Sequence, residues 1–206
     1  MVQWCTTGLF TFLPIHAAGC YDNERAVECA SDYFVSSYTP TIGALLGRPP
    51  VRPTQKLKMM VVIQSSELKS TEKELEIIRN YVSNDSLIEF GTPGNPAEVE
   101  AVAPRLPDAS IVHFACHGQQ DRLKPLDSAL KLDDGLLRVS RIMKEKMQNG
   151  SLAFLCACET ARGDQKLPDE AMSLAASLLF SGFRHVIGTM WCVYFSGTIL
   201  WNMFLI

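Results

Sequence analysis

The chain has 206 residues, of which 47% are hydrophobic and 20% charged, and its formal net charge is −3. That length suits one domain with a sizeable core and leaves little room for a second. The small negative charge excludes the basic surface by which proteins hold nucleic acid, so no nucleic-acid partner is expected.

Cysteine content and hydropathy indicate the cellular compartment. Seven cysteines, an odd number without regular spacing, are unlike a secreted disulfide framework, so a reduced, cytoplasmic protein is expected. The N-terminus lacks the basic segment of a signal peptide. Residues 186–206 carry no charge and are long enough to span a bilayer, but 186–191 is typical of a buried strand, which we favour over a membrane helix.

The clearest break in the chain is segment 47–56, which contains three prolines. Proline cannot continue a helix or pair within a central strand, so this segment is predicted to be a loop. It separates an N-terminal block, residues 1–46, from a predicted α/β core, residues 57–191. Residues 192–206 then form a hydrophobic tail.

Within the core, short apolar runs alternate with helical patterns. The run 58–64 predicts a strand buried on both faces. Further strands are predicted at 87–90, 110–115, 152–157 and 185–190. Strands separated by helices predict βαβ units, and therefore a three-layer α/β/α sandwich with a mainly parallel sheet.

Local signals mark the ends of two predicted helices. Thr71 and Glu74 have the spacing of a capping box at the start of the first. The other is predicted to begin at Pro168, followed by two acidic residues that suit the positive end of the helix dipole. Gly182 is its predicted C-terminal cap.

Two of the predicted strands run into residues that can perform chemistry. Strand 110–115 leads to His117 and Gly118, and strand 152–157 leads to Cys158. If these strands are parallel neighbours, His117 and Cys158 emerge at the same edge of the sheet. An imidazole takes the proton of a thiol and later returns it to a leaving amine. The N–H groups of Gly118 and Cys158 are then the predicted oxyanion donors.

Two other interpretations use the same atoms. Cysteines in strands are usually inert and a histidine at a strand end is usually structural; on this ground Cys116 and Cys156 are predicted to be core residues. A zinc site is the second alternative, with ligands drawn from His113, His117, Cys156 and Cys158. The two histidines would lie about 13 Å apart on an extended strand, so neither a metal nor another cofactor is expected.

The sequence around these residues is familiar. Residues 113–118 (HFACHG) resemble the HFAxHG segment of the CHAT domain family, caspase-like domains often joined to helical-repeat proteins. Residues 156–161 (CACETA) resemble the SACETA segment of that family. Further segments resemble family motifs in their usual order: 12–19, 36–41, 128–130, 168–171 and 188–191.

This resemblance implies the fold of caspases, separases and legumains, with His117 as base and Cys158 as the nucleophile that forms an acyl-enzyme. Asp169 and Glu170 would be candidates for the substrate pocket, although capping a helix is favoured for both. The implied function is a cysteine endopeptidase in regulated intracellular proteolysis, cell death or defence signalling. Its partners would be a protein or peptide substrate and helical-repeat or signalling domains. The alternative is a catalytically inactive signalling or interaction module.

The two ends of the chain depart from the family pattern. Relatives usually continue past the position of Trp191 with a polar, acidic stretch and a further helix, whereas residues 192–206 are hydrophobic. The beginning resembles the middle of a family domain. Residues 1–206 are therefore expected to form a single, partial CHAT domain, a fragment whose exposed apolar surface would favour aggregation or inactivity.

Overall fold

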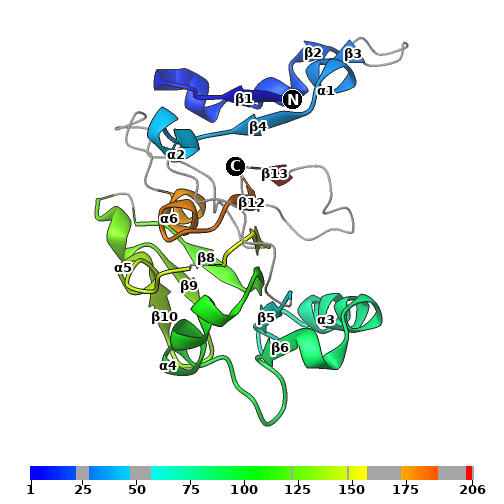
Figure 1. Cartoon of the computed structure of the whole chain (residues 1–206), viewed down its shortest axis with the longest axis vertical. Helices are drawn as coiled ribbons and strands as arrows, with labels where there is room; N and C mark the ends of the chain where they lie inside the picture. The colour runs from blue at the N-terminus through cyan, green and yellow to red at the C-terminus, as the bar shows by residue number, and fades with distance from the viewer. Residues whose placement is uncertain are drawn as a thin grey trace.

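The computed structural model describes residues 1–21, 28–46, 57–121, 123–147, 149–156, 173–189 and 203–205. The predicted loop 47–56 lies outside these ranges. Figure 1 shows the N-terminal block at the top of the long axis and α3, Ser70–Tyr81, in the lower half of the molecule at the right.

A six-stranded sheet in the order β13-β12-β11-β7-β5-β6 forms the centre of the core (Figure 1). Its strands are β5 Met59–Ile63, β6 Leu87–Phe90, β7 Ile111–Ala115, β11 Leu152–Leu155, β12 His185–Thr189 and β13 Met203–Leu205. Strands β5, β6, β7, β11 and β12 are parallel, and β13 pairs antiparallel with β12 at the edge. Each parallel strand coincides with one of the five predicted apolar runs.

Helices cover both faces of this sheet, so the predicted three-layer α/β/α class is confirmed. On one face lies α3, whose Leu75 is buried against Val61 and Ile63 of β5. The other face is covered by several shorter elements: α4 Val99–Val102, the 3-10 helix η4 Ala103–Asp108, α5 Val139–Ile142 and α6 Leu174–Phe180. The short 3-10 turns η3 Asn84–Ser86 and η5 Pro125–Asp127 connect other elements.

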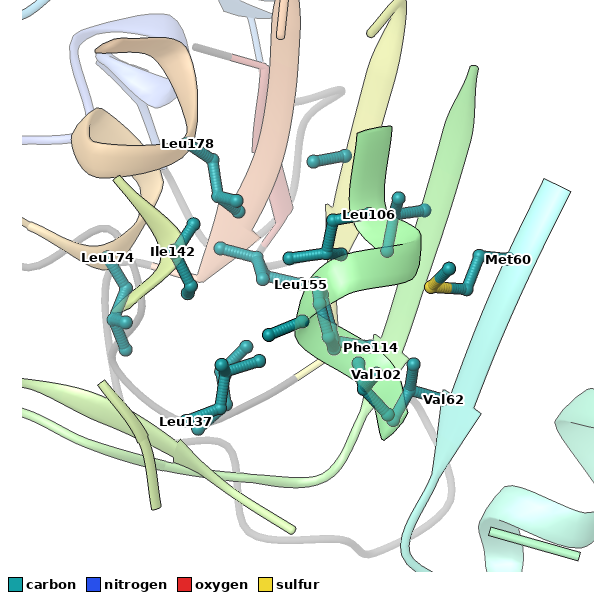
Figure 2. Close-up of a cluster of buried hydrophobic side chains, with 14 of the residues drawn as sticks. Met60, Val62, Val102, Leu106, Phe114, Leu137, Ile142, Leu155, Leu174 and Leu178 are labelled. Atoms are coloured by element: carbon teal, nitrogen blue, oxygen red, sulfur yellow. The ribbon is translucent and has the colours of Figure 1, made fainter. Parts of the chain in front are cut away.

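The main core lies on the face opposite α3. Side chains alternate across a strand, so Met60 and Val62 of β5 point into this core while Val61 and Ile63 face α3. Figure 2 shows Phe114 and Leu155 from the neighbouring strands meeting side chains of the covering helices. Burial of this contiguous apolar surface is the principal stabilising contribution to the fold.

A second, antiparallel sheet follows directly from the central one and was not predicted. It consists of β8 His117–Gln119, β9 Ala129–Lys131 and β10 Leu136–Arg138, in the order β10-β9-β8. Strands of three residues are too short for an alternating pattern to distinguish them from loops. This small sheet carries the candidate residues His117 and Gly118.

The N-terminal block forms two strand pairs. β1 Val2–Trp4 pairs parallel with β4 Ser36–Tyr38, and β2 Gly19–Cys20 pairs antiparallel with β3 Glu28–Cys29. Its helical elements are η1 Gly8–Phe12, η2 Ile15–Ala17, α1 Ala30–Tyr33 and α2 Ile42–Leu46. Because β13 contacts β4, the block lies against the edge of the central sheet (Figure 1).

The predicted capping box at the start of α3 is wrong. Lys69 precedes the helix with helical dihedral angles, and Thr71 lies inside it with its hydroxyl donating to the Leu68 carbonyl at 2.6 Å. The Glu74 carboxylate accepts a hydrogen bond from a buried histidine, His113 of β7, on the face of the sheet that α3 covers. Thr71 and Glu74 therefore lie on the side of the helix that packs against the sheet, and they do not cap its N-terminus.

The end of α6 agrees with the sequence, but its start does not. Gly182, with φ of +117°, follows the helix and donates its N–H to the Leu179 carbonyl at 3.1 Å. At the other end Ser173 is the cap, since its hydroxyl accepts the Ala176 N–H at 3.1 Å. The predicted start at Pro168 lies outside the described residues.

Glycine is required where β6 leaves the sheet. Gly91 has a φ of +86°, and a Cβ there would come within 1.9 Å of the Ile63 carbonyl oxygen. The Ser65 hydroxyl donates to the Gly91 carbonyl at 3.0 Å. The end of β6 is thereby held closely against the segment that follows β5.

None of the helices in the described ranges is long and apolar enough to cross a membrane. Residues 186–189, at the start of the uncharged stretch considered as a membrane span, belong to β12.

Candidate active site

The two strands that lead to the predicted catalytic residues are parallel neighbours. In the register of β7 and β11, Phe114 lies opposite Leu155, and the Cys156 N–H donates to the Phe114 carbonyl at 2.8 Å. His117 follows Phe114 by three positions, and Cys158 follows Leu155 by three positions. Cys158 itself lies outside the described residues, so its pairing with His117 stays a prediction.

The backbone of His117 is fixed by the end of β5. Its N–H donates to the Oε1 atom of Gln64 at 3.3 Å, while the Gln64 N–H donates to the Ala115 carbonyl at 3.0 Å. Gln64 is only 2% exposed, so its side-chain amide is a buried polar group with a defined partner. These contacts fix the point at which β7 passes into β8.

The side chain of His117 is accessible and lies beside two charged residues. The imidazole is 44% exposed, and its Nε2 atom is 3.6 Å from Oε2 of Glu67, in the turn after β5. The other carboxylate oxygen of Glu67 accepts from the Lys131 ammonium at 2.5 Å. This hydrogen bond, together with the charges of Lys131 and His117, outweighs the opposing effect of desolvation and lowers the pKa of Glu67. Glu67 is therefore a carboxylate at neutral pH.

A partly buried polar cluster lies beneath this edge, between α3 and the sheet. His113 Nε2 is 3.0 Å from Glu74 Oε2, and the Cys156 thiol points to Glu74 Oε1 at 3.8 Å. The His113 ring also stacks on Phe154, with centroids 5.1 Å apart. Two residues of the zinc alternative thus share a carboxylate, although no group of three or more His, Cys, Asp or Glu among the described residues could hold a metal ion.

Cys116 and Cys156 occupy different environments. Cys116 is 1% exposed, and burial, with a smaller effect from Cys156, raises the pKa of its thiol far above the ordinary value. It is an inert core residue, as predicted. Cys156 is only partly buried and belongs to the polar cluster, so its assignment to the core holds only in part.

Comparison with known families identifies the fold. The CHAT domain family model matches residues 6–200, most of the chain. The chain belongs to the CHAT domain family. This family is caspase-like, which agrees with the parallel sheet and its two helical layers. A search among curated proteins gave no match.

The predicted pocket residues of this CHAT domain, Asp169 and Glu170, lie outside the described residues. The capping role that the sequence favoured for both therefore stays a prediction, while Ser173 is the cap of α6. Gly118 is the second residue of β8, opposite Leu130 of β9.

Sequence reasoning did not identify the residues around His117. Gln64 could have been noticed, because it is a polar residue at the end of an otherwise apolar run. Glu67 and Lys131 gave no signal, since one lies in a turn and the other in a three-residue strand 64 positions away. Only the tertiary fold of the CHAT domain brings them to the same imidazole.

Proposed function

We propose that this CHAT domain is a cysteine-type endopeptidase in which His117 is the general base and Cys158 the nucleophile. The observation that supports it is the register of β7 and β11, in which Phe114 lies opposite Leu155. In the sequence, His117 and Cys158 each follow one of these paired residues by three positions. The exposure of His117 adds support, because a substrate must reach the imidazole.

The mechanism follows from these two groups. His117 takes the thiol proton, and the Cys158 sulfur attacks the scissile carbonyl carbon, so that the carbonyl electron pair moves onto oxygen. The N–H groups of Gly118 and Cys158 are the proposed donors to this oxyanion. As the C–N bond breaks, the imidazolium protonates the leaving amine and a thioester remains. Water then attacks the thioester with His117 again as base, releasing the acid and the thiol.

The proposed setting is intracellular. A protein or peptide substrate would be cut in regulated proteolysis, such as cell-death or defence signalling, under the control of helical-repeat or signalling partner domains. The odd number of cysteines supports a reducing compartment. Which acidic residue lines the pocket is also part of the proposal, with Asp169 and Glu170 as candidates.

A second candidate function is a docking module without catalysis. The N-terminal block has many large apolar side chains that are more than half exposed. Exposed apolar side chains gathered in one region are typical of interaction surfaces, so they favour this function. In the N-terminal block these side chains are Met1, Leu9, Phe10, Tyr21, Tyr33, Val35, Ile42 and Leu46.

Digestion of a peptide library made from a cell lysate separates the two functions. Mass spectrometry of new N-termini should find cleavage by the wild-type chain and none by Cys158→Ala or His117→Ala, because each variant lacks one member of the dyad. Cys5→Ala, which changes an exposed cysteine of the N-terminal block, is the matched control and should cleave normally. Cleavage by Cys158→Ala at the wild-type rate would refute the peptidase proposal.

A further inference from the structure

The turn after β5 brings a carboxylate to the candidate base. Glu67 lies between His117 and Lys131, with one oxygen directed to each. We propose that Glu67 is a positioning residue for His117, which holds the imidazole with Nε2 protonated and leaves Nδ1 to accept the thiol proton. This inference rests on the proposed peptidase function and adds a third member to the predicted pair.

Lys131 fixes the position of this carboxylate. In the β8–β9 ladder Lys131 lies directly opposite His117, so their side chains are neighbours on one face of the small sheet. The ammonium binds Oε1 of Glu67 at 2.5 Å, which leaves Oε2 for the imidazole at 3.6 Å. Glu67 therefore bridges two residues that the strand pairing has already placed side by side.

The turn that carries Glu67 is held by its own backbone. The N–H groups of Glu67 and Leu68 both donate to the Gln64 carbonyl, at 3.3 and 2.9 Å. Gln64 in turn accepts the His117 N–H through its buried side chain. The backbone of the base and the backbone of its acidic neighbour are thus fixed by the same residue.

The carboxylate of Glu67 can influence both the tautomer and the charge of the His117 imidazole. A neutral histidine exists as two tautomers, and a negative charge beside one nitrogen favours the proton on that nitrogen. A carboxylate near Nε2 favours the proton on Nε2, so the lone pair of Nδ1 is free to act as base. The same carboxylate then stabilises the positive charge that develops when Nδ1 takes the proton of Cys158. Because Lys131 lowers the pKa of Glu67, the negative charge is present throughout the neutral range.

The test measures the alkylation rate of Cys158 by iodoacetamide, resolved by mass spectrometry from the other cysteines of the full chain. In the wild type Cys158 should react below the pH of a free thiol, and His117→Ala should remove that advantage. Glu67→Gln keeps the shape and removes the charge; we expect the rate to fall by up to about fivefold, the effect of one half-exposed ion pair. Glu67→Asp should recover part of the rate. Glu72→Gln, an exposed glutamate of α3, should leave it unchanged.

A second measurement separates positioning from a general effect on folding. The ¹⁵N shifts of the His117 ring should report the Nε2-protonated tautomer in the wild type and a mixture in Glu67→Gln, with the remaining amide shifts preserved. A normal Cys158 rate and an unchanged tautomer in Glu67→Gln would overturn the inference about Glu67 and leave the peptidase proposal intact. Equal Cys158 rates in wild type and His117→Ala would overturn both.

Discussion

The two faces of the central sheet are built from different interactions. The face opposite α3 is covered by a large apolar core that joins β5, β7 and β11 to four helical elements. The face under α3 has a much smaller apolar cluster, supplemented by the polar contacts of Glu74 and by the ion pair between Arg79 and Glu89.

This difference shows that one face of the sheet mainly stabilises the fold, while the other mainly fixes the positions of particular side chains. Apolar burial is non-directional, so the large face stabilises the fold without fixing any one side chain precisely in angle. Buried hydrogen bonds are directional, and leaving one partner unpaired carries a penalty. The contacts of Glu74 with His113 and Cys156 therefore fix α3 beneath the edge from which His117 emerges.

The largest effect is expected from Phe114→Ala on the large face. Phe114 is completely buried, so the substitution removes apolar contacts and leaves a cavity that should cost about 3–5 kcal/mol of unfolding free energy. Urea denaturation followed by circular dichroism measures this. Phe180→Ala, which removes a side chain that is 44% exposed, is the control and should cost far less. Similar losses for the two variants would contradict the assignment of the main core to this face.

An intermediate effect is expected from Glu74→Ala on the face under α3. The variant leaves the buried His113 ring without its carboxylate, and an unpaired buried polar group costs about 1–3 kcal/mol. Glu76→Ala changes an exposed glutamate two positions further along the same helix and should cost clearly less. Equal denaturation midpoints for the two variants would show that the polar cluster does not hold α3.

The smallest effect is expected for the partly exposed ion pair at the outer edge of the same face. Hydrogen bonds from Arg79, and its charge, lower the pKa of Glu89 against an opposing effect of desolvation. A carboxyl group whose pKa is lowered by folding stabilises the native state above its unfolded pKa and loses that contribution as the pH falls through the folded value. Glu89→Gln should therefore cost about 0.2–1 kcal/mol at pH 7 and almost nothing well below about pH 4. A stability difference that is the same at both pH values would argue against this pair.

The sequence predicted the five parallel strands because each is a short, mainly apolar run, a pattern that depends on local sequence alone. It did not predict β8, β9 and β10, whose pairing depends on contacts between distant segments. The capping-box prediction failed for a related reason. Thr71 and Glu74 have a spacing that suits a helix start, but the partner of Glu74 is His113, 39 positions away.

For the candidate site, the sequence predicted which strands would meet but not what surrounds the base. The rule that functional residues follow the ends of parallel strands pointed to His117 without knowledge of its neighbours. The positions of Glu67 and Lys131 are set by a turn and by a short ladder, neither of which leaves a periodic pattern. Cys158, Asp169 and Glu170 remain predictions.

The close approach of Gly91 to Ile63 affects how the results of a mutational scan of this chain should be interpreted. In a library of random substitutions, position 91 would tolerate no side chain, because the carbonyl of Ile63 occupies the place of a Cβ. A variant there would displace the segment containing Ser65 and, with it, the turn that carries Glu67. A map of mutational tolerance would consequently score Gly91 as highly as a catalytic residue. Substitutions at Gly91 would fail because the backbone of Ile63 lies too close to it, and not because Gly91 takes part in catalysis.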